Sequence, residues 1–344
     1  MNDKNKYIAL TTGEPAGIGP ELVVQLLQDP VTDHLCIFAD PDLLLERATL
    51  IGASLAIKGD TLLGPGGTAH IYPIELNESS IAGDLDIKNA PYVIDMLTRA
   101  VDGCLTGEFA AMVTAPVQKS TLIEAGNVFV GHTEFLAERA GVPKPVMMLA
   151  NDRLRVALVT IHMPLSEVPG AITQESLEAV LRVIDFDLRR RFQISNPVIG
   201  VCGLNPHAGE AGDLGNAEME IIQPAIDQLR AKGIQVTGPM ASDSMFHAAA
   251  RSNYDVAICM YHDQALIPVK ALGFEYGINL TLGLPIIRTS PDHGTALDIA
   301  GRGQANSLSL TSAVAYAGLI ARHRGLVTVS AQEAANDLGA KRGR

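Results

Sequence analysis

Short apolar segments that end in turns recur along this chain, and they constrain its fold more than any other feature. Six of them are rich in valine, isoleucine and alanine, and they occupy residues 6–12, 34–40, 109–116, 155–162, 197–205 and 254–262. Between them, residues 91–105, 173–192 and 217–233 carry apolar side chains at helical spacing. Buried strands that alternate with helices are typical of a mostly parallel sheet. The sequence therefore predicts an α/β fold.

The first apolar segment leads into the glycine-rich turn GEPAGIGPE, a layout that is also found in nucleotide-binding proteins. Its glycines, Gly13, Gly17 and Gly19, lack the GxGxxG spacing of a dinucleotide-binding turn. We expect them to let the first strand turn tightly into a helix that begins near Pro20, with Glu14 facing the cleft. The chain also contains no P-loop motif and no GxSxG motif.

Two stretches predict no regular structure. Residues 58–70, with the sequence KGDTLLGPGGTAH, are rich in glycine, and we expect a surface loop there. The C-terminal residues 329–344 are polar and are expected to fray.

Charge and cysteine content narrow the class of protein. The formal net charge of −12 argues against binding to nucleic acid or to an anionic membrane, because both require a basic face. The four cysteines are far apart and form no CxxC pair, which is typical of free thiols in a reducing compartment. We find no signal-peptide pattern and no apolar run of 18 residues. We therefore expect a cytoplasmic protein.

Three histidines, His162, His207 and His262, follow predicted strands. The carboxyl ends of parallel strands line the ligand crevice, so these imidazoles are candidates to converge there. Three neutral imidazoles with an open fourth position describe a catalytic site for a divalent metal. The alternative is that each histidine only hydrogen-bonds loop backbone. Asp243 and Asp263 either orient a ligand imidazole or are ordinary loop aspartates.

Cationic and polar residues in otherwise apolar sequence indicate an anion site. A buried unpaired charge is costly, so Lys270 and Arg288 need an anionic partner. We interpret that partner as a phosphate or carboxylate, held by a cradle of five residues. These are His132, Thr133, Lys270, Asn279 and Arg288. The alternative is internal salt bridges to Glu275 or Asp292.

Several motifs carry a resemblance to known dehydrogenases. GEPAGIGPE is similar to the first turn of isopropylmalate and isocitrate dehydrogenases, and DHGTALDIAGRGQAN resembles their adenosine-binding loop. A closer resemblance is to the 4-hydroxythreonine-4-phosphate dehydrogenase family of pyridoxal phosphate biosynthesis. It rests on VTAPVQKS, GHTEFLAE, CGLNPHAGEAG, MYHDQALIPVK and GINLTLGLPIIRTSPDHGTALDIAG, and the matching motifs span residues 7–310.

The family resemblance assigns roles to residues of this sequence. It implies a metal bound by His162, His207 and His262, at a site shared across a homodimer interface, and substrate contacts from the five cradle residues. The metal is zinc, cobalt or magnesium. By the resemblance of the late glycine loop, the cofactor-binding residues are Gly294, Thr295, Asp298 and Asn306. Asp243, Asp263 or a water molecule is the candidate proton acceptor.

The resemblance also implies a reaction and a fold. The enzyme would oxidise 4-phosphohydroxy-L-threonine to 2-amino-3-oxo-4-phosphobutanoate, which loses CO₂ to give 3-amino-2-oxopropyl phosphate. The hydride acceptor is NAD or NADP, since Arg302 could meet a 2′-phosphate and Asp298 a ribose hydroxyl. The expected fold is isopropylmalate dehydrogenase-like, with two α/β/α lobes around an active-site cleft. Residues 1–125 and 275–344 form the first lobe, and residues 126–274 form the second.

Two other functions remain open from the sequence. One is a dehydrogenase for a phosphorylated sugar acid, such as erythronate or threonate 4-phosphate, which replaces the substrate amine by a hydroxyl. The other is a non-catalytic protein that binds a metal or a phosphorylated ligand on the same scaffold. The cofactor-type loop argues against the second, because a protein that only binds has no use for it.

Overall fold

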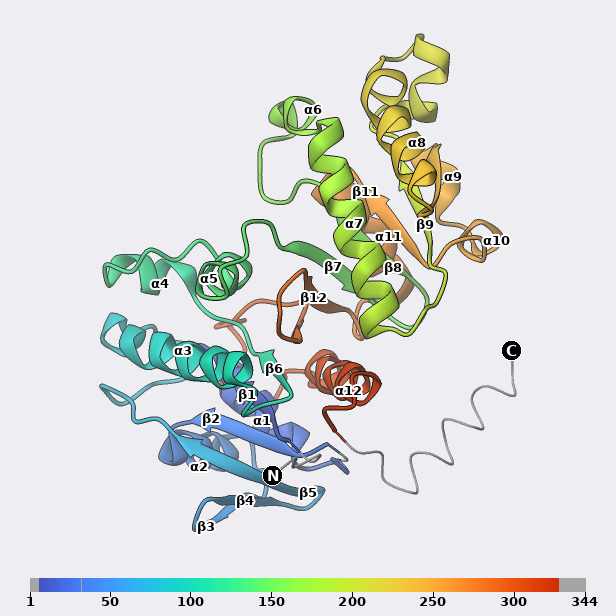
Figure 1. Ribbon diagram of the computed structural model, residues 1–344. Coiled ribbons are helices and arrows are strands. Elements are labelled where there is room, and N and C mark those ends of the chain that lie inside the picture. The colour runs from blue at the N-terminus through green and yellow to red at the C-terminus, as the bar shows by residue number, and fades with distance from the viewer. Residues whose placement is uncertain (1–5, 32, 328–344) are drawn as a thin grey trace.

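A single sheet runs through the whole molecule in the computed structural model, which describes residues 6–31 and 33–327 (Figure 1). In this part of the chain the thirteen strands have the order β10–β9–β11–β8–β7–β12–β13–β6–β1–β2–β5–β4–β3. The strands are β1 (Ile8–Thr11), β2 (Leu35–Ala39), β3 (Ala56–Lys58), β4 (Thr61–Gly64), β5 (Gly67–Pro73), β6 (Ala111–Thr114), β7 (Val146–Ala150), β8 (Arg155–Leu158), β9 (Val198–Cys202), β10 (Gln235–Met240), β11 (Val256–Cys259), β12 (Ile278–Leu282) and β13 (Arg288–Pro291). The C-terminal residues expected to fray lie outside the described residues.

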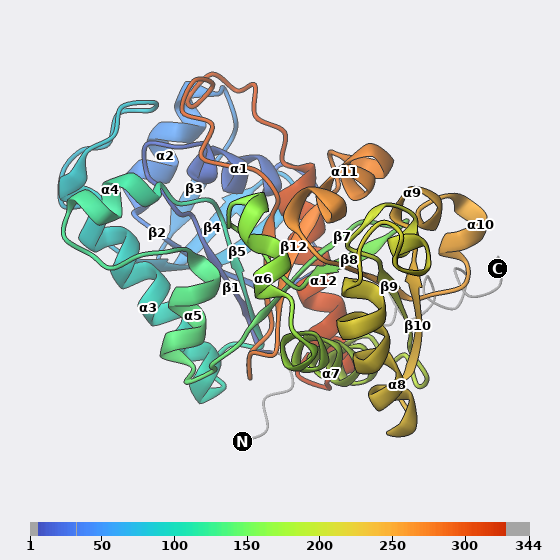
Figure 2. The same ribbon diagram turned by 90° about the horizontal axis from the view of Figure 1, so that it is seen from above.

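Helices cover both faces of this sheet (Figure 2). The α-helices are α1 (Gly19–Leu26), α2 (Pro41–Leu50), α3 (Ala90–Thr106), α4 (Lys119–Glu124), α5 (His132–Arg139), α6 (Val168–Ala171), α7 (Gln174–Arg191), α8 (Gln223–Ala231), α9 (Ser242–Met245), α10 (Ala248–Arg251), α11 (His262–Gly273) and α12 (Leu308–His323). Shorter helical turns lie at Ile87–Asn89, Leu165–Glu167, Pro206–Gly212 and Glu218–Ile222.

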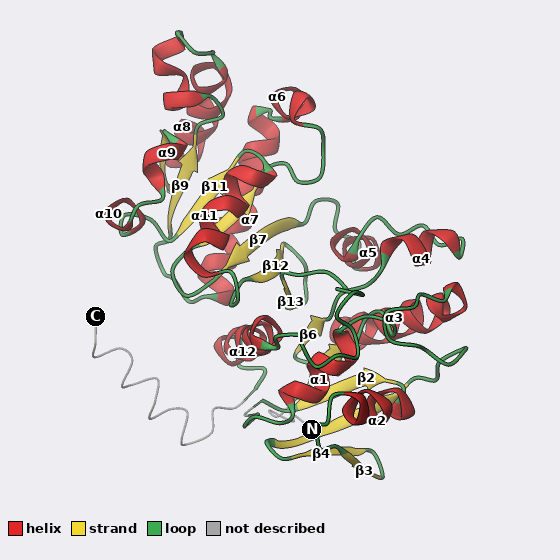
Figure 3. Cartoon of the chain, turned by 180° about the vertical axis from the view of Figure 1, so that it is seen from behind, coloured by secondary structure: helices red, strands yellow, loops and turns green. Residues whose placement is uncertain are grey.

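The alternation of side chains along each strand divides the core into layers. In β1, Ile8 and Leu10 belong to a core that also contains apolar residues of α1 and α12 on one face, whereas Ala9 packs with α3 on the other. In β11, Ile258 belongs to the first core and Cys259 packs with α11. Successive strand residues point to opposite faces, so each strand contributes to two cores. The result is the predicted α/β arrangement, with strands between two layers of helices (Figure 3).

The strand and helix predictions are largely confirmed. Each of the six apolar segments contains a strand, namely β1, β2, β6, β8, β9 and β11. Every residue of these strands is buried except the first residue of β8 and of β9, which are half-buried. Helix α7 begins with a capping box in which the Thr173 side chain accepts from the Ser176 N–H and the Ser176 hydroxyl accepts from the Thr173 N–H. Its apolar face, which includes Leu181 and Ile184, is buried.

The prediction of a surface loop at residues 58–70 is wrong. This segment forms β4 and the first half of β5, two antiparallel strands at the edge of the sheet. Its glycines permit close packing rather than disorder. A Cβ at Gly64 would lie 2.3 Å from the Leu27 carbonyl oxygen, and one at Gly66 would lie 1.9 Å from that of Asp29.

Antiparallel strands join the two halves of the sheet. Most strands on either side pair in parallel, apart from the antiparallel edge β5–β4–β3. Between them, β12 pairs antiparallel with both β13 and β7, and β7 pairs antiparallel with β8. In Figure 1, β1 to β6 with α1 to α3 and α12 lie in the lower half, and β7 to β11 lie in the upper half. The lobe boundaries near residues 125 and 275 stay a prediction.

Candidate active site

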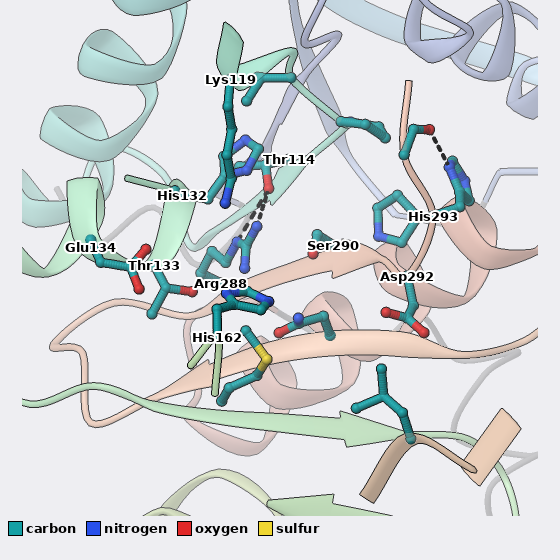
Figure 4. A pocket seen from close by; sticks show the side chains of 18 of the residues that line it. Thr114, Lys119, His132, Thr133, Glu134, His162, Arg288, Ser290, Asp292 and His293 are labelled. Atoms are coloured by element: carbon teal, nitrogen blue, oxygen red, sulfur yellow. Dashed lines mark hydrogen bonds between the residues drawn. The ribbon is translucent and has the colours of Figure 1, made fainter. Parts of the chain in front are cut away.

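A cavity of about 470 Å³ lies where the two halves of the sheet meet. Its walls come from the end of β6, the start of α5, strands β12 and β13, helix α11 and the segment after β8 (Figure 4). Eight of the residues predicted from the sequence line this cavity, namely His132, Thr133, His162, His262, Lys270, Asn279, Arg288 and Gly294. The fold therefore brings the whole predicted cradle together with two of the three predicted metal ligands.

Arg288, the first residue of β13, is a buried cation, and the effect of burial on its pKa is opposed only in part by the charge of Glu134 in the same cavity. Its side chain is 3% exposed and donates to the Thr114 hydroxyl at 2.7 and 3.2 Å and to the Thr281 hydroxyl at 3.1 Å. No carboxylate pairs with it in the described part of the chain. Burial lowers the pKa of Arg288 to about 10, so it remains charged at neutral pH. A buried guanidinium that lines a cavity and forms no ion pair is suited to bind an anion.

Lys270 in α11 has a partner in the protein. Its Nζ lies 3.1 Å from Asp292 Oδ2 and 5.4 Å from the centre of the Phe274 ring. Of the two internal partners considered from the sequence, Asp292 is therefore the one that it contacts. Lys270 still lines the cavity, but its charge is partly balanced by this ion pair, whereas Arg288 forms none with a described residue.

Three cavity residues hold buried polar atoms without a partner among the described residues. They are His132 Nε2, Asn279 Oδ1 and His293 Nε2. Buried polar atoms are nearly always hydrogen-bonded, so these atoms mark places for polar groups of a ligand. The pKa of His132 is well below its usual value because of burial and, to a smaller extent, the charges of Arg288 and Lys119. His132 is therefore a neutral imidazole.

His162 and His262 form a pair of imidazoles at one side of the cavity. Their ring centres are 5.6 Å apart, and His262 Nδ1 lies 2.8 Å from Asp263 Oδ1. Asp263 therefore lies where a carboxylate that orients this imidazole is expected, and its role toward a metal stays a prediction. Burial lowers the pKa of His162, and the charges of Lys119 and His262 lower it further. A neutral imidazole offers the lone pair that a metal needs.

His207 and Asp243 do not reach this cavity. His207 lies after β9 in the turn Pro206–Gly212 with a φ of 53°, and Asp243 lies in the short helix α9, which contacts that turn. Both side chains are exposed. Within residues 6–31 and 33–327 no group of three histidine, cysteine, aspartate or glutamate side chains is close enough to hold a metal. One chain thus supplies two adjacent imidazoles, and the third predicted ligand is at its surface.

The opening glycine turn packs against the loop after β13. The Ile18 N–H donates to the Thr295 carbonyl at 3.0 Å, and Glu21 Oε2 accepts from the Gly301 N–H at 2.7 Å. Glu14, expected to face the cleft, is 2% exposed and does not line the cavity.

Of the four predicted cofactor residues, Gly294 lines the cavity and Thr295 is buried beside it. The Thr295 hydroxyl donates to Gln118 Oε1 at 3.0 Å. Asp298 and Asn306 are exposed farther along the loop, and Asn306 Oδ1 accepts from the Leu308 N–H at 2.9 Å, at the start of α12.

Sequence reasoning missed several cavity residues. They are Thr114, Lys119, Glu134, Ser290 and His293, with Asp292 considered only as an ion-pair partner. Lys119 forms no ion pair or hydrogen bond with any residue that the structure describes, and Figure 4 shows its side chain pointing toward His132. Its position just after β6 was a usable signal, because the carboxyl ends of strands line the crevice.

Comparisons with known proteins show which family the chain resembles over most of its length. The chain matches the family described as "Pyridoxal phosphate biosynthetic protein PdxA" over residues 32–317. The chain belongs to the PdxA family. A relative named 4-hydroxythreonine-4-phosphate dehydrogenase, from Serratia proteamaculans, is 48% identical over 315 residues, which are 90% of this chain and 96% of that protein. The resemblance stated from the sequence motifs is thereby confirmed, and the chain is an oxidoreductase.

Solved PdxA structures share the fold. The crystal structure of 4-hydroxythreonine-4-phosphate dehydrogenase from Klebsiella pneumoniae superposes with a TM-score of 0.82 at 36% identity, covering 92% of this chain and 99% of that one. A terephthalate 1,2-cis-dihydrodiol dehydrogenase from Burkholderia xenovorans has a TM-score of 0.63 at 24% identity, covering 94% of this chain and 99% of that one. The second likeness concerns the fold alone. No helix in the described part of the chain is long and apolar enough to cross a membrane.

Proposed function

We propose that this PdxA-family enzyme oxidises 4-phosphohydroxy-L-threonine with NAD or NADP, assisted by a divalent metal, in pyridoxal phosphate biosynthesis. The product, 2-amino-3-oxo-4-phosphobutanoate, is a β-keto acid and loses CO₂ to give 3-amino-2-oxopropyl phosphate. The observation that carries this proposal is the position of Arg288, a buried cation that forms no ion pair with any described residue, in the same cavity as the imidazoles of His162 and His262. A phosphorylated alcohol is a substrate that can engage both.

The substrate phosphate is the anion that Arg288 binds. Lys119 is a second free cation at this end of the cavity, and His132 Nε2 supplies a further polar contact. Lys270 and Asp292 lie together at the cavity wall. There the ammonium can meet a substrate oxygen while Asp292 holds it in place.

The donor set fits a divalent metal. His162 and His262 are close together, the pKa of His162 is lowered, and Asp263 orients His262. We assign the third position to His207 of a second copy of the chain, because His207 is exposed and remote from the pair. Zinc, cobalt or magnesium bound there would supply the Lewis acidity that lowers the pKa of the substrate hydroxyl.

The loop after β13 is the proposed cofactor site. Gly294 and Thr295 lie where this loop meets the cavity, and Asp298 and Asn306 are exposed along it. Hydride acceptance is the chemistry that a bound nicotinamide supplies. The enclosing elements hold the substrate carbon near this loop. The proton acceptor is Asp263, water or, since Asp243 does not reach the cavity of its own chain, Asp243 of the second copy that supplies His207. Because all four cysteines are free thiols, we place the enzyme in the cytoplasm.

The first test is a spectrophotometric assay of NAD and NADP reduction with two substrates. We expect turnover of 4-phosphohydroxy-L-threonine to exceed that of erythronate 4-phosphate, and to fall when metal is removed with a chelator and recover when zinc or cobalt is restored. Faster oxidation of erythronate 4-phosphate would instead identify a sugar-acid dehydrogenase. Absence of any cofactor reduction, together with absence of NAD and NADP binding in calorimetry, would indicate a protein that only binds.

The second test addresses the shared metal site. His162→Ala and His207→Ala each disable every site in a homodimer of one variant. In a mixed dimer, one site contains both substitutions and the other contains neither. With random pairing, half the dimers are mixed and half of their sites are intact, so activity should return to about one quarter of the wild-type value. No recovery on co-expression would mean that the three histidines do not form a site between two copies.

A further inference from the structure

A second cavity, of about 240 Å³, lies apart from the candidate active site. It is enclosed by the C-terminal part of α7, the turn between β12 and β13, and the residue that follows α12. The lower end of α7 lies beside α12 in Figure 1. Four arginines line the cavity, Arg182, Arg190, Arg191 and Arg324. Among the described residues, Asp187 is the one carboxylate in its wall.

Both carboxylate oxygens of Asp187 already have partners, and one carboxylate cannot balance four arginines. Its Oδ1 lies 3.1 Å from Arg191 Nε, and its Oδ2 accepts from the Gly283 N–H at 2.8 Å. Arg191 is 3% exposed and also donates to the carbonyls of Thr281 and Leu284. The buried pair Arg191–Asp187 is therefore neutral and complete, and it forms the floor of the cavity.

Arg190 and Arg324 are the two arginines of this cavity that have no direct ion-pair partner among the described residues. Neither side chain forms an ion pair or a hydrogen bond within residues 6–31 and 33–327. Arg190 lies 5.6 Å from the centre of the Phe186 ring. Burial lowers the pKa of Arg324, the charge of Arg190 lowers it further, and the charge of Asp187 opposes this shift only in part. Arg182, in contrast, pairs with Glu178 at 2.9 Å.

The helix ends explain only part of this arrangement. Arg190 is in the last turn of α7 and Arg324 directly follows α12, where the helix dipole favours a cation. That effect acts on each helix separately. It does not account for two unpaired guanidinium groups in one cavity of a protein whose net charge is −12.

We propose that this cavity is a binding site for a phosphate monoester dianion. Two unpaired guanidinium groups match the charge of the phosphate and its fork-like oxygen geometry. The rest of the wall is apolar, with Val183, Leu284 and Pro285, which suits the organic part of the ester. The site is separate from the proposed substrate site and does not depend on it.

The cavity contacts the same hairpin as the candidate active site. Arg191 donates to the Thr281 carbonyl, and the Thr281 hydroxyl accepts from Arg288. Strands β12 and β13 thus line the candidate active site through Asn279 and Arg288, and the turn that joins them lines the second cavity.

Arginine labelling with phenylglyoxal tests the site directly. Peptide mass spectrometry reports the labelling rate of each arginine in the full chain, with and without inorganic phosphate or phenyl phosphate, in a buffer free of other multivalent anions. At a ligand concentration ten times its Kd, Arg190 and Arg324 should be labelled about tenfold more slowly. Arg189 is the internal control, because it neighbours Arg190 but pairs with Asp185 and does not line the cavity.

The outcomes separate the sources of the phosphate. Protection of Arg190 and Arg324 by phenyl phosphate alone supports the site and shows that the organic part contributes to binding. Protection by both anions supports the site and shows that the phosphate group is sufficient. Protection by neither anion, or equal protection of Arg189, overturns it. The proposed substrate site does not interfere, since it contains neither labelled arginine.

Variants give a second, independent criterion. Arg324→Gln should abolish the protection of Arg190, and Arg190→Gln should abolish that of Arg324, whereas Arg189→Gln should change neither. Arg190 is exposed and Arg189 is half-buried. Arg190→Gln and its control Arg189→Gln are therefore expected to fold with an unchanged melting temperature. Protection of Arg190 that persists at the same ligand concentration in Arg324→Gln would refute the proposal.

Discussion

Arg288 donates two hydrogen bonds to the Thr114 hydroxyl, at 2.7 and 3.2 Å, across the parallel pair β13–β6. Both residues are buried at the point where the two halves of the sheet join. The hydroxyl orients the guanidinium but carries no negative charge. The neighbouring strand therefore fixes the position of the cation and leaves its charge available to a ligand.

The first prediction concerns that charge. Arg288→Gln should raise KM for 4-phosphohydroxy-L-threonine roughly 10- to 100-fold, since a hydrogen bond to a charged group contributes about 1.5–3 kcal/mol. Steady-state kinetics with 4-phosphohydroxy-L-threonine and with its analogue that lacks the phosphate group measures this. The increase in KM should be confined to the phosphorylated substrate. Arg99→Gln, which removes an exposed arginine paired with Asp95, is the control and should change nothing. An unaltered KM in Arg288→Gln would rule out phosphate binding by Arg288.

The second prediction concerns the pair Lys270–Asp292. Lys270→Gln should raise KM for the same substrate by roughly tenfold, because it removes a cavity cation. Asp292→Asn should have a smaller effect in the same direction, because the ammonium remains but loses the group that holds it at 3.1 Å. A larger effect of Asp292→Asn than of Lys270→Gln would show that the carboxylate itself is the group required.

The third prediction separates metal binding from stability. His207 is exposed, so His207→Ala should leave the melting temperature within about 2 °C of that of the metal-free wild-type chain. Metal content, measured by elemental mass spectrometry after dialysis, should fall to background. His34→Ala, which removes another exposed histidine, should retain the metal. Full metal content in His207→Ala would exclude it as a ligand.

The fourth prediction is a pH dependence of stability caused by Glu14. Burial raises the pKa of Glu14 from 4.5 to about 7, so the folded chain holds this proton more tightly than the unfolded chain. Stability should therefore decline as the pH rises from about 4.5 to 7, by an amount on the order of 3 kcal/mol for this group.

Urea denaturation at pH 5 and pH 8 tests the role of Glu14. Glu14→Gln keeps an acceptor for the Ala16 N–H but cannot ionise, so the variant should lose this part of the decline and gain stability at pH 8 relative to the wild type. An identical pH dependence in the two proteins would show that Glu14 is not the cause.

Local patterns predicted six of the thirteen described strands and part of the cavity lining. The six apolar segments became strands because their residues are buried on both sides, a condition that leaves a continuous apolar run in the sequence. The cradle residues were found because cations stand out in apolar sequence. Lys270 and Arg288 nevertheless differ in the structure. Lys270 pairs with Asp292, which the loop after β13 brings near, whereas Arg288 forms no ion pair with a described residue.

What the sequence could not predict depends on long-range contacts. Strands such as β12 and β10 contain polar or glycine residues, so no apolar run indicates them. The two-strand edge at residues 58–70 depends on the close approach of Gly64 and Gly66 to backbone after α1. The separation of His207 from His162 is likewise set by the packing of the turn after β9 against α9.

The continuous sheet has a mechanical consequence for the enzyme. In proteins whose lobes are joined by flexible linkers, a hinge opens the cleft without breaking strand pairing. Here β12 pairs with β7 over five residues, from Ile278 opposite Ala150 to Leu282 opposite Val146. A change in the angle between the halves must therefore be a twist of these shared strands. Asn279 lies on β12 and lines the cavity, so the same elastic deformation would move a ligand contact whenever the enzyme flexes.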